Sequence, residues 1–313
     1  MQKILITGSL AYDQLTNFQG VFQDALSAQK SNHLSIAFPV INKQIFFGGC
    51  AGNIVYNAKL LEEDFILLGI AGKDFHTYEK WLQKNKINTS HVIRENRDFT
   101  SEASVVTDLK SQQITVFYPG AASLAKKHSQ KIKQTISRLA PKLVFAHIAP
   151  NDRHFMLACI DACRQNKIPY FFDPGQAMSL FSAAELRSIT KHAFGLFLNE
   201  CELGLLSKLL KLNPPQIAQL CTLMIVTLGE KGSDIYFQKK KIHIPSRKPK
   251  IVKDPTGCGD AYRAGFLANL ASHFPNLTPN ILERAGKSGT KLAMACLQSL
   301  GTQNHKFHGQ SAN

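Results

Sequence analysis

The 313-residue sequence has no hydrophobic run long enough to cross a membrane as a helix. A transmembrane helix needs about 20 consecutive apolar residues, and no stretch of this chain approaches that length. The N-terminal residues, MQKILITG, contain a short apolar run of strand length but lack the apolar core and cleavage site of a secretory signal. We therefore expect a first β-strand here, a cytoplasmic protein and no membrane partner.

Disulfide and zinc-binding patterns are missing as well. The seven cysteines are odd in number, scattered, and form no Cys-x-x-Cys pair. The eleven histidines do not cluster at the spacing of metal ligands. These absences argue against a disulfide framework and a zinc site, and they fit reduced thiols in the cytoplasm.

Acidic residues are scarce relative to basic ones. The chain has 37 Lys and Arg against 22 Asp and Glu, a net charge of +15 and an isoelectric point near 9.5. Such an excess points to an anionic partner: nucleic acid, an anionic membrane or a phosphorylated small molecule. The basic runs at 239–241 and 247–250 support nucleic acid best, yet they lack interleaved aromatics and a helix-turn-helix pattern. We therefore expect no nucleic-acid partner.

Apolar runs of strand length alternate with helical patterns along most of the chain, in an ordinary globular composition. This alternation predicts an α/β fold with a mostly parallel central sheet and helices on both faces. The expected strands are 3–9, 66–71, 142–149, 168–173, 195–199 and 223–228, and the expected helices are 52–63 and 152–165, the second capped by Asn151.

Two stretches interrupt the alternation, at about 13–47 and about 92–118. They contain short alternating runs, including an expected hairpin at 101–108 and 113–118, and several aromatics of the buried type. We interpret them as a small β-layer that covers a site at the strand ends as a lid does; two irregular surface loops are the alternative. A second hairpin is expected at 232–237 and 241–245.

The segment that carries the chemistry is DPTGCGDAYRAGF, residues 254–266. Gly257 and Gly259 lack a Cβ, so the backbone there can approach a ligand closely. The residues that follow are helical, which places the turn at a helix N-terminus, where free N–H groups and the helix dipole favour an anion. Asp260 beside such a phosphate site suits a base that accepts a proton from an attacking hydroxyl. A plain glycine turn with Asp260 as a helix cap is the alternative.

This segment resembles the second signature of the ribokinase, or PfkB, family of sugar and nucleoside kinases. The resemblance implies a three-layer α/β/α fold, a small β-sheet lid, and one kinase domain over residues 1–313. It implies Asp260 as the catalytic base and the amides of Gly257, Cys258 and Gly259 as an anion hole. Pro255 and Cys258 depart from the commoner Thr and Ala of the family.

The string FGGCAGN at 47–53 resembles the first signature of the family. The resemblance implies that Gly48 and Gly49 let the backbone approach the acceptor and that Asn53 binds its ring hydroxyls. It also implies that Asp13, after the first strand, accepts hydrogen bonds from two vicinal hydroxyls. Taken alone, Asp13 fits an ordinary turn residue.

Two further elements resemble the family's nucleotide site. Asn199 and Glu202 match an Asn-x-x-Glu element, which implies that Asn199 lies at the ATP site and that Glu202 holds Mg²⁺ through water; a helix N-cap is a second, compatible interpretation. Thr227, Gly229 and Gly232 match a turn along the nucleotide phosphates, for which a simple hairpin turn is the alternative. The implied cofactors are ATP and Mg²⁺.

Two other nucleotide-binding patterns fail. The string GKS at 286–288 resembles the end of a Walker A loop, but Ile281 stands where its first glycine is required. No Gly-x-Gly-x-x-Gly follows the first strand, so a dinucleotide site has no support.

Within the family, the chain is similar in detail to bacterial adenosine kinases of the ribokinase type. The strings FYPGA at 117–121, DPGQ at 173–176 and SLGTQ at 299–303 carry this similarity. It implies ATP-dependent phosphorylation of the 5′-hydroxyl of adenosine, with Phe117 over the adenine and Gln176 near it. Phe117 as a core aromatic of the lid is the alternative, and the position of a second lid aromatic falls near Ala103.

The alternatives left open are a kinase for a free sugar such as ribose or fructose, and a basic nucleic-acid-binding protein that keeps the kinase fold. The resemblance also leaves open a homodimer formed through the lid.

Overall fold

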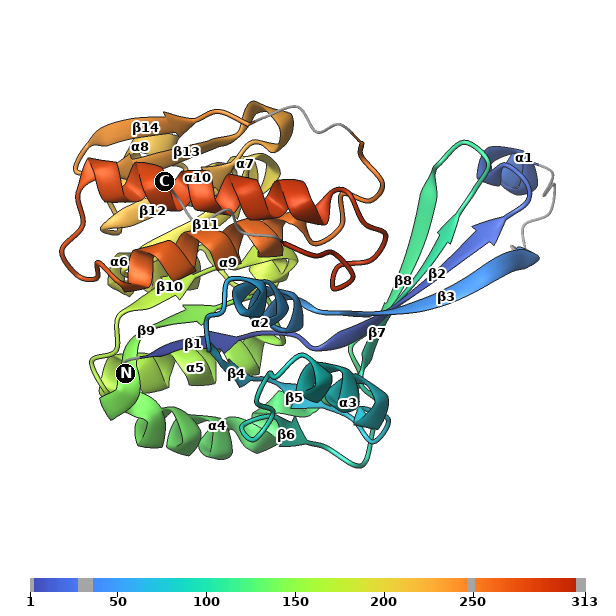
Figure 1. The fold of residues 1–313 in the computed structure, drawn as a ribbon, viewed down its shortest axis with the longest axis horizontal. Coiled ribbons are helices and arrows are strands. Elements are labelled where there is room, and N and C mark those ends of the chain that lie inside the picture. Colours follow the sequence, from blue (N-terminus) through green and yellow to red (C-terminus); the bar gives the residue numbers. More distant parts are fainter. Residues whose placement is uncertain (1–2, 28–35, 247–250, 308–313) are drawn as a thin grey trace.

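The computed structural model describes residues 3–27, 36–246 and 251–307. Its main sheet has eight strands in the order β14-β13-β12-β11-β10-β9-β1-β4 (Figure 1). Their bounds are β1 (Lys3–Thr7), β4 (Ile66–Leu68), β9 (Leu143–Ile148), β10 (Tyr170–Phe172), β11 (Gly195–Asn199), β12 (Leu223–Thr227), β13 (Ser233–Phe237) and β14 (Lys240–Ile244). The six strands from β12 to β4 pair in parallel, and β13 and β14 add an antiparallel hairpin at one edge. The predicted mostly parallel sheet is confirmed.

Helices cover both faces of this sheet, as expected. Those packed on one face are α2 (Cys50–Leu60), α9 (Cys258–Ala271) and α10 (Pro279–Cys296), and those on the other are α4 (Ala125–Leu139), α5 (Arg153–Gln165), α6 (Ala183–His192), α7 (Glu200–Leu210) and α8 (Pro214–Ala218). Alternate strand residues feed two separate cores: Ile4 and Phe145 pack with α2 and α9, whereas Leu5 and Ala146 pack with α4 and α5. A sheet buried on both faces explains why its strands are continuously apolar in sequence.

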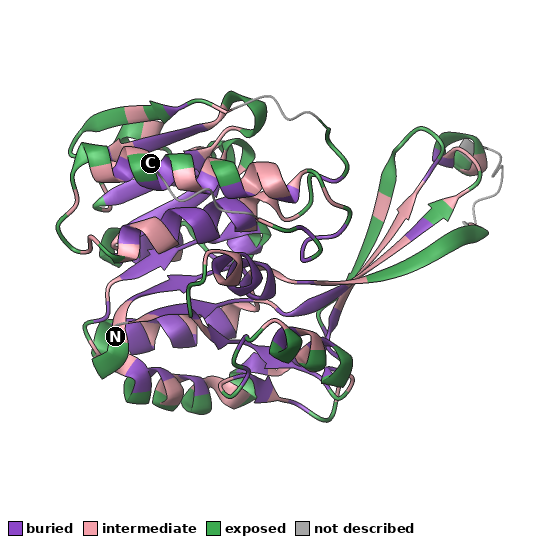
Figure 2. Cartoon of the chain, viewed as in Figure 1, coloured by how far each residue is buried: buried purple, intermediate pink, exposed green. Residues whose placement is uncertain are grey.

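The second sheet has four strands in the order β3-β2-β7-β8. Their bounds are β2 (Ala11–Phe18), β3 (Val40–Gly48), β7 (Ser101–Thr107) and β8 (Gln113–Tyr118). The β2–β7 pair is parallel and the other two pairs are antiparallel, so the expected hairpin at 101–118 is confirmed. This sheet projects from the main body with α1 (Phe22–Ser27) at its tip (Figure 1), and most of β3 is exposed (Figure 2).

The register of the small sheet places one row of side chains together. Asp13 is paired with Phe46 on one side and with Ala103 on the other, and Ala103 is paired with Phe117. Paired residues of neighbouring strands share a face of the sheet. Asp13 and Phe117 therefore lie on the same face.

Three local expectations need correction. The strand expected at 66–71 divides into β4 and β5 (Ile70–Ala71), and β5 leaves the main sheet to pair with β6 (Ile93–Arg94) near α3 (His76–Lys84). The helix expected from residue 52 begins at Cys50.

The third correction concerns the start of α5, where Asp152 and not Asn151 is the N-cap. The Asp152 carboxylate accepts hydrogen bonds from the amides of His154 (2.8 Å) and Phe155 (3.3 Å). Asn151 instead uses its Oδ1 to accept from the Asp152 amide at 2.7 Å. A carboxylate accepts two amide bonds and complements the helix dipole, which favours Asp152 in this role.

Across the described ranges, no helix combines the length and apolar character that crossing a bilayer requires. The basic run at 247–250 lies outside the described residues.

Candidate active site

Two adjoining cavities open at the carboxyl ends of the parallel strands. The first, about 600 Å³, lies between the small sheet and the strand ends, and we call it the lid-side cavity. The second, about 500 Å³, lies at the ends of β11 and β12, and we call it the sheet-side cavity. Both are lined by Cys50, Pro150, Gln176, Gly257 and Asp260. Asp260 therefore stands where the two cavities meet.

The glycine turn places Asp260 at the start of α9. Gly257 is the N-cap residue in a left-handed conformation (φ 76°), and a Cβ there would lie 2.7 Å from the Thr302 side chain. The first-turn amides of Gly259 and Asp260 have no partner within the helix. The amide of Cys258 donates to the Pro255 carbonyl at 3.3 Å, so of the three amides expected to bind an anion, this one is already engaged.

A chain of hydrogen bonds holds the Asp260 carboxylate. The side-chain amide of Asn53 donates to Asp260 Oδ2 at 2.8 Å. Asn53 Oδ1 in turn accepts from Thr302 Oγ1 (2.8 Å) and Gln303 Nε2 (3.0 Å), which fixes the orientation of the amide. The structure thus places buried Asn53 against the carboxylate and gives it a positioning role besides the expected contact with acceptor hydroxyls.

Thr302 and Gln303 are site residues that sequence reasoning missed. The string at 299–303 carried only a family resemblance, and nothing in it signalled contact with residue 53. Gln303 Nε2 also donates to Tyr78 at 2.6 Å, and the Tyr78 hydroxyl donates to the Gly48 carbonyl at 2.7 Å. The network therefore ties the C-terminal loop to the glycine pair at 48–49.

The environment of Asp260 shifts the pKa of its carboxyl group toward neutral pH. Burial raises the pKa of Asp260 to about 6, against the opposing effects of the Arg263 charge and the Asn53 hydrogen bond. A general base works best when its pKa lies near the operating pH. Asp260 is mostly ionised at pH 7 and can still accept a proton.

Asp13 faces the lid-side cavity from β2. A Cβ on Gly48 would lie 2.2 Å from Asp13 Oδ2, so a larger residue there would displace the carboxylate from its present position. Gly49 has φ 84°, and a Cβ on it would meet the backbone near Ser9. Burial, followed by the negative charges of Asp260 and Asp254, raises the pKa of Asp13 to about 7. Donors from a ligand would favour its ionised form.

The rest of the lid-side cavity offers both apolar and polar contacts. Phe117 lines it and is 56% exposed, which does not fit a core aromatic. Ala103, on the same row, leaves space where a second ring would stand. Asn151 also lines the cavity with a buried Nδ2 that has no hydrogen-bond partner among the described residues. Sequence reasoning assigned it a family resemblance and an expected cap, but no contact with a ligand. Gln176 lines both cavities.

The sheet-side cavity contains most of the residues expected at the nucleotide site. Asn199 and Glu202 form a reciprocal capping box at the start of α7, with 2.8 Å in both directions. Thr227 and Gly229 line the cavity, but Gly232 does not. A Cβ on Gly232 would lie 2.0 Å from the Ile244 carbonyl, so its glycine is explained by contact with β14.

Glu202 fits the expected role near Mg²⁺. One carboxylate oxygen accepts the Asn199 amide, while the other is not engaged in the capping box. Mg²⁺ prefers carboxylate oxygens, phosphates and several retained waters over an all-protein cage. The described residues contain no group of three or more His, Cys, Asp or Glu side chains placed to hold a metal.

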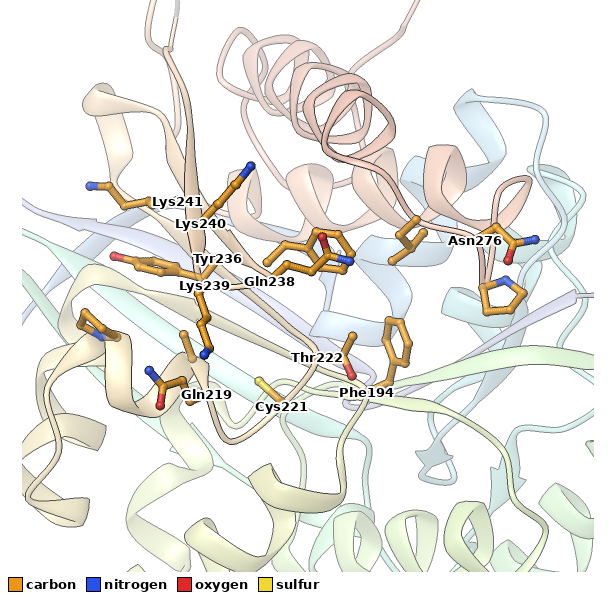
Figure 3. Close-up of a pocket in the computed structure, with 15 residues that line it drawn as sticks. Phe194, Gln219, Cys221, Thr222, Tyr236, Gln238, Lys239, Lys240, Lys241 and Asn276 are labelled. Carbon is orange, nitrogen blue, oxygen red and sulfur yellow. The ribbon is translucent and has the colours of Figure 1, made fainter.

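A separate cavity of about 1070 Å³ lies beside the tip of the β13–β14 hairpin (Figure 3). Lys239, Lys240 and Lys241 line it together with Phe194 and Cys221, and it shares no residue with the two cavities above. The lysine-rich turn is therefore separate from the Asp260 site. The string GKS at 286–288 lies inside α10 and not in a loop, which agrees with its rejection as a Walker A phosphate loop.

Comparison with known proteins shows which proteins the chain is similar to. Residues 33–307 match the model of the pfkB family of carbohydrate kinases. The chain is 33% identical over 307 residues to a nucleoside kinase of Methanocaldococcus jannaschii, covering 97% of this chain and 93% of that protein. It is 27% identical over 278 residues to a ribokinase of Mus musculus, covering 83% and 81%.

Solved structures of nucleoside kinases are also similar to this chain. A nucleoside kinase of Burkholderia thailandensis in complex with inosine has a TM-score of 0.82 at 29% identity, covering 96% of this chain and 93% of that one. The same enzyme in complex with ADP-inosine has a TM-score of 0.79 at 30% identity, covering 96% and 91%.

Proposed function

We propose, since the chain belongs to the pfkB family of carbohydrate kinases, that it transfers the γ-phosphate of ATP to the 5′-hydroxyl of a nucleoside, with adenosine as substrate and AMP as product. The observation that carries this proposal is the junction of the two cavities at Asp260. A phosphoryl group that crosses this junction passes beside a carboxylate poised to accept a proton.

In the proposed reaction the nucleoside occupies the lid-side cavity. Asp13 accepts hydrogen bonds from the two ribose hydroxyls, and Phe117 stacks on the base. This orientation directs the 5′-hydroxyl toward Asp260 at the cavity junction. Holding two reactants in line converts a bimolecular step into an effectively unimolecular one.

ATP occupies the sheet-side cavity, with its phosphates along Thr227 and Gly229 and toward the first turn of α9. Asp260 takes the proton as the 5′-oxygen attacks the γ-phosphorus, and ADP leaves. The free amides of Gly259 and Asp260 and the helix dipole stabilise the charge on the phosphoryl oxygens. Glu202 would hold Mg²⁺ through water, and the ion would supply charge neutralisation at the phosphates.

We further propose that the four-stranded sheet acts as a lid within a single kinase domain that spans residues 1–313. The exposed residues Ile45 and Val116 lie in one row across β3 and β8 and give one face of this sheet an apolar surface, which supports a homodimer formed through the lid.

The second candidate is a kinase for a free sugar, favoured by the similarity to a ribokinase. Asp13, Asn53 and Asp260 would serve either substrate. Phe117 favours the nucleoside, because an exposed ring lining the cavity can stack on a base, which a bare sugar lacks.

The test is an ADP-release assay with adenosine, inosine, cytidine, ribose and fructose, followed by ³¹P NMR of the product. The proposal expects adenosine to have the highest kcat/KM and to give a 5′-monophosphate. A preference for inosine would support the proposed phosphoryl transfer to a nucleoside and would replace adenosine as the substrate. Turnover of sugars alone would establish the second candidate, and no turnover with any acceptor would refute both.

A further inference from the structure

Arg263 is a buried cation that the reaction described above does not use. It lies on α9 three residues after Asp260, so the two side chains lie on the same side of the helix. It is 8% exposed and lines the sheet-side cavity. Burying a charge is costly unless it is paired. The hydrogen-bond partners of Arg263 therefore indicate its role.

Asp173, at the end of β10, holds the guanidinium with both of its oxygens. Arg263 Nε donates to Asp173 Oδ2, and Nη2 donates to Oδ1 at 2.9 Å. His147 Nε2 lies 3.3 Å from Asp173 Oδ2 on the other side. Burial would raise the pKa of Asp173, but the charges and hydrogen bonds of Arg263 and His147 together hold the pKa below its ordinary value. This bidentate pair fixes the plane of the guanidinium.

The third nitrogen, Nη1, is left over from this pair. It forms no hydrogen bond with any described residue. A Cβ built on Gly259 would lie 2.9 Å from Nη1, so this nitrogen lies over the first turn of α9, beside the amides expected to bind an anion. A pairing needed only for folding would not require a free donor at this point.

We propose that Arg263 is a further catalytic residue, whose Nη1 donates a hydrogen bond to a non-bridging oxygen of the γ-phosphoryl group, and that Asp173 positions it. The proposal rests on the kinase function proposed above. In the step, the bond between the acceptor oxygen and phosphorus forms while the bond from phosphorus to the β–γ bridging oxygen breaks. The acceptor proton passes to Asp260. Arg263 keeps its protons, because a guanidinium does not titrate in proteins.

Arg263 would also reduce the electrostatic cost of the site. The sheet-side cavity contains the carboxylates of Glu202 and Asp260, which repel a polyanion. A fixed positive charge beside the anion hole offsets that repulsion and stabilises charge as it develops on the phosphoryl oxygens.

The test compares Arg263→Gln and Arg263→Lys with Arg284→Gln, an exposed arginine of α10, as the matched control. We expect kcat to fall by roughly 10²–10³-fold in both Arg263 variants, the range for losing one transition-state donor. Affinity for a non-hydrolysable ATP analogue should fall at least about tenfold, while affinity for ADP stays within about threefold, because only the γ-phosphate is contacted. Arg284→Gln should match the wild type.

The Lys variant guards against misfolding, since it keeps a positive charge beside Asp173 but cannot both pair with Asp173 and reach the amides. Asp173→Asn should give a smaller loss, of roughly 10–10²-fold in kcat, with the same preferential loss of the ATP analogue.

Unchanged kcat in Arg263→Gln would overturn the inference. So would equal losses of ADP and analogue binding in both Arg263 variants with a lowered melting temperature, which is the result of a structural role. A wild-type protein that binds the analogue more tightly than ADP in an Arg263-dependent way, yet phosphorylates no acceptor, would support the phosphate contact and refute the proposed kinase reaction.

Discussion

The two cavities that meet at Asp260 have walls of different kinds. The sheet-side cavity is formed by strand ends of the main sheet and the first turns of α7 and α9, which are held by buried cores on both faces. The lid-side cavity takes one wall from the small sheet, where most of β3 and β8 is exposed. The walls of the sheet-side cavity, which the proposed function assigns to the phosphates, are therefore packed against the main body, whereas one wall of the proposed acceptor cavity is a largely exposed sheet. Variants on the two sides should give different kinetic signatures.

The largest effect is expected at the junction itself. Asp260→Asn keeps the shape and the hydrogen bond from Asn53 but removes the proton acceptor. We expect kcat to fall by roughly 10²–10⁴-fold, the range typical of losing a general base. Affinity for ATP, measured by calorimetry, should change little because the sheet-side walls are intact. Turnover near the wild-type rate would refute the assignment.

A smaller effect, confined to the kinetics of the nucleoside, is expected at Asp13. Asp13→Asn should lower kcat/KM for the nucleoside by roughly 10–10²-fold, because it weakens two hydrogen bonds to a charged acceptor. The KM for ATP should stay within about threefold. Asp24→Asn, the same change at an exposed position of α1, is the control. The loss should vanish with a 2′,3′-dideoxynucleoside, and its persistence there would argue that Asp13 does not contact the hydroxyls.

The pH dependence should report both carboxylates. Because burial raises the pKa of Asp260 to about 6 and that of Asp13 to about 7, ionised forms are lost as the pH falls through this range. We expect kcat/KM to decrease by up to about tenfold per pH unit between pH 7 and 6, and by up to about 100-fold per unit below pH 6, where both groups protonate. In Asp13→Asn, one group remains and the limiting slope should be one. A flat profile from pH 5 to 8 would contradict a carboxylate base in this environment.

The smallest effect is expected at the lid aromatic. Phe117→Ala should raise the KM for the nucleoside by roughly 3–10-fold, the worth of one stacked ring, and leave kcat nearly unchanged. Phe99→Ala is the matched control, since Phe99 is similarly exposed but does not line the cavity. Equal increases in KM for the two substitutions would refute the proposed stacking of Phe117 on the base.

Local features of the site could be predicted from the sequence better than long-range contacts. The turn at 257–260 is local: its glycines, its helix start and its carboxylate lie within one short string, so the sequence predicted their arrangement. The Asn199–Glu202 capping box is local in the same way.

Long-range contacts could not be predicted in this manner. The partner that orients Asn53 lies 250 residues away at Gln303, and no spacing rule links the two. Gly232 was expected at ATP because the stretch 227–232 resembles the family's turn along the nucleotide phosphates, but a Cβ at this position would clash with the carbonyl of Ile244 across a hairpin. The division of the strand at 66–71 likewise depends on pairing with β6, which the local apolar pattern does not encode.

The central claim is that the phosphoryl group passes directly from the sheet-side to the lid-side cavity, with Asp260 as base and never as nucleophile. The stereochemical course at phosphorus tests it most directly, using ATP made chiral at the γ-phosphorus with oxygen isotopes and sulfur. A single in-line transfer inverts the configuration, and inversion is the result we predict. Retention would require two displacements through a phosphorylated residue, and that result would contradict the account.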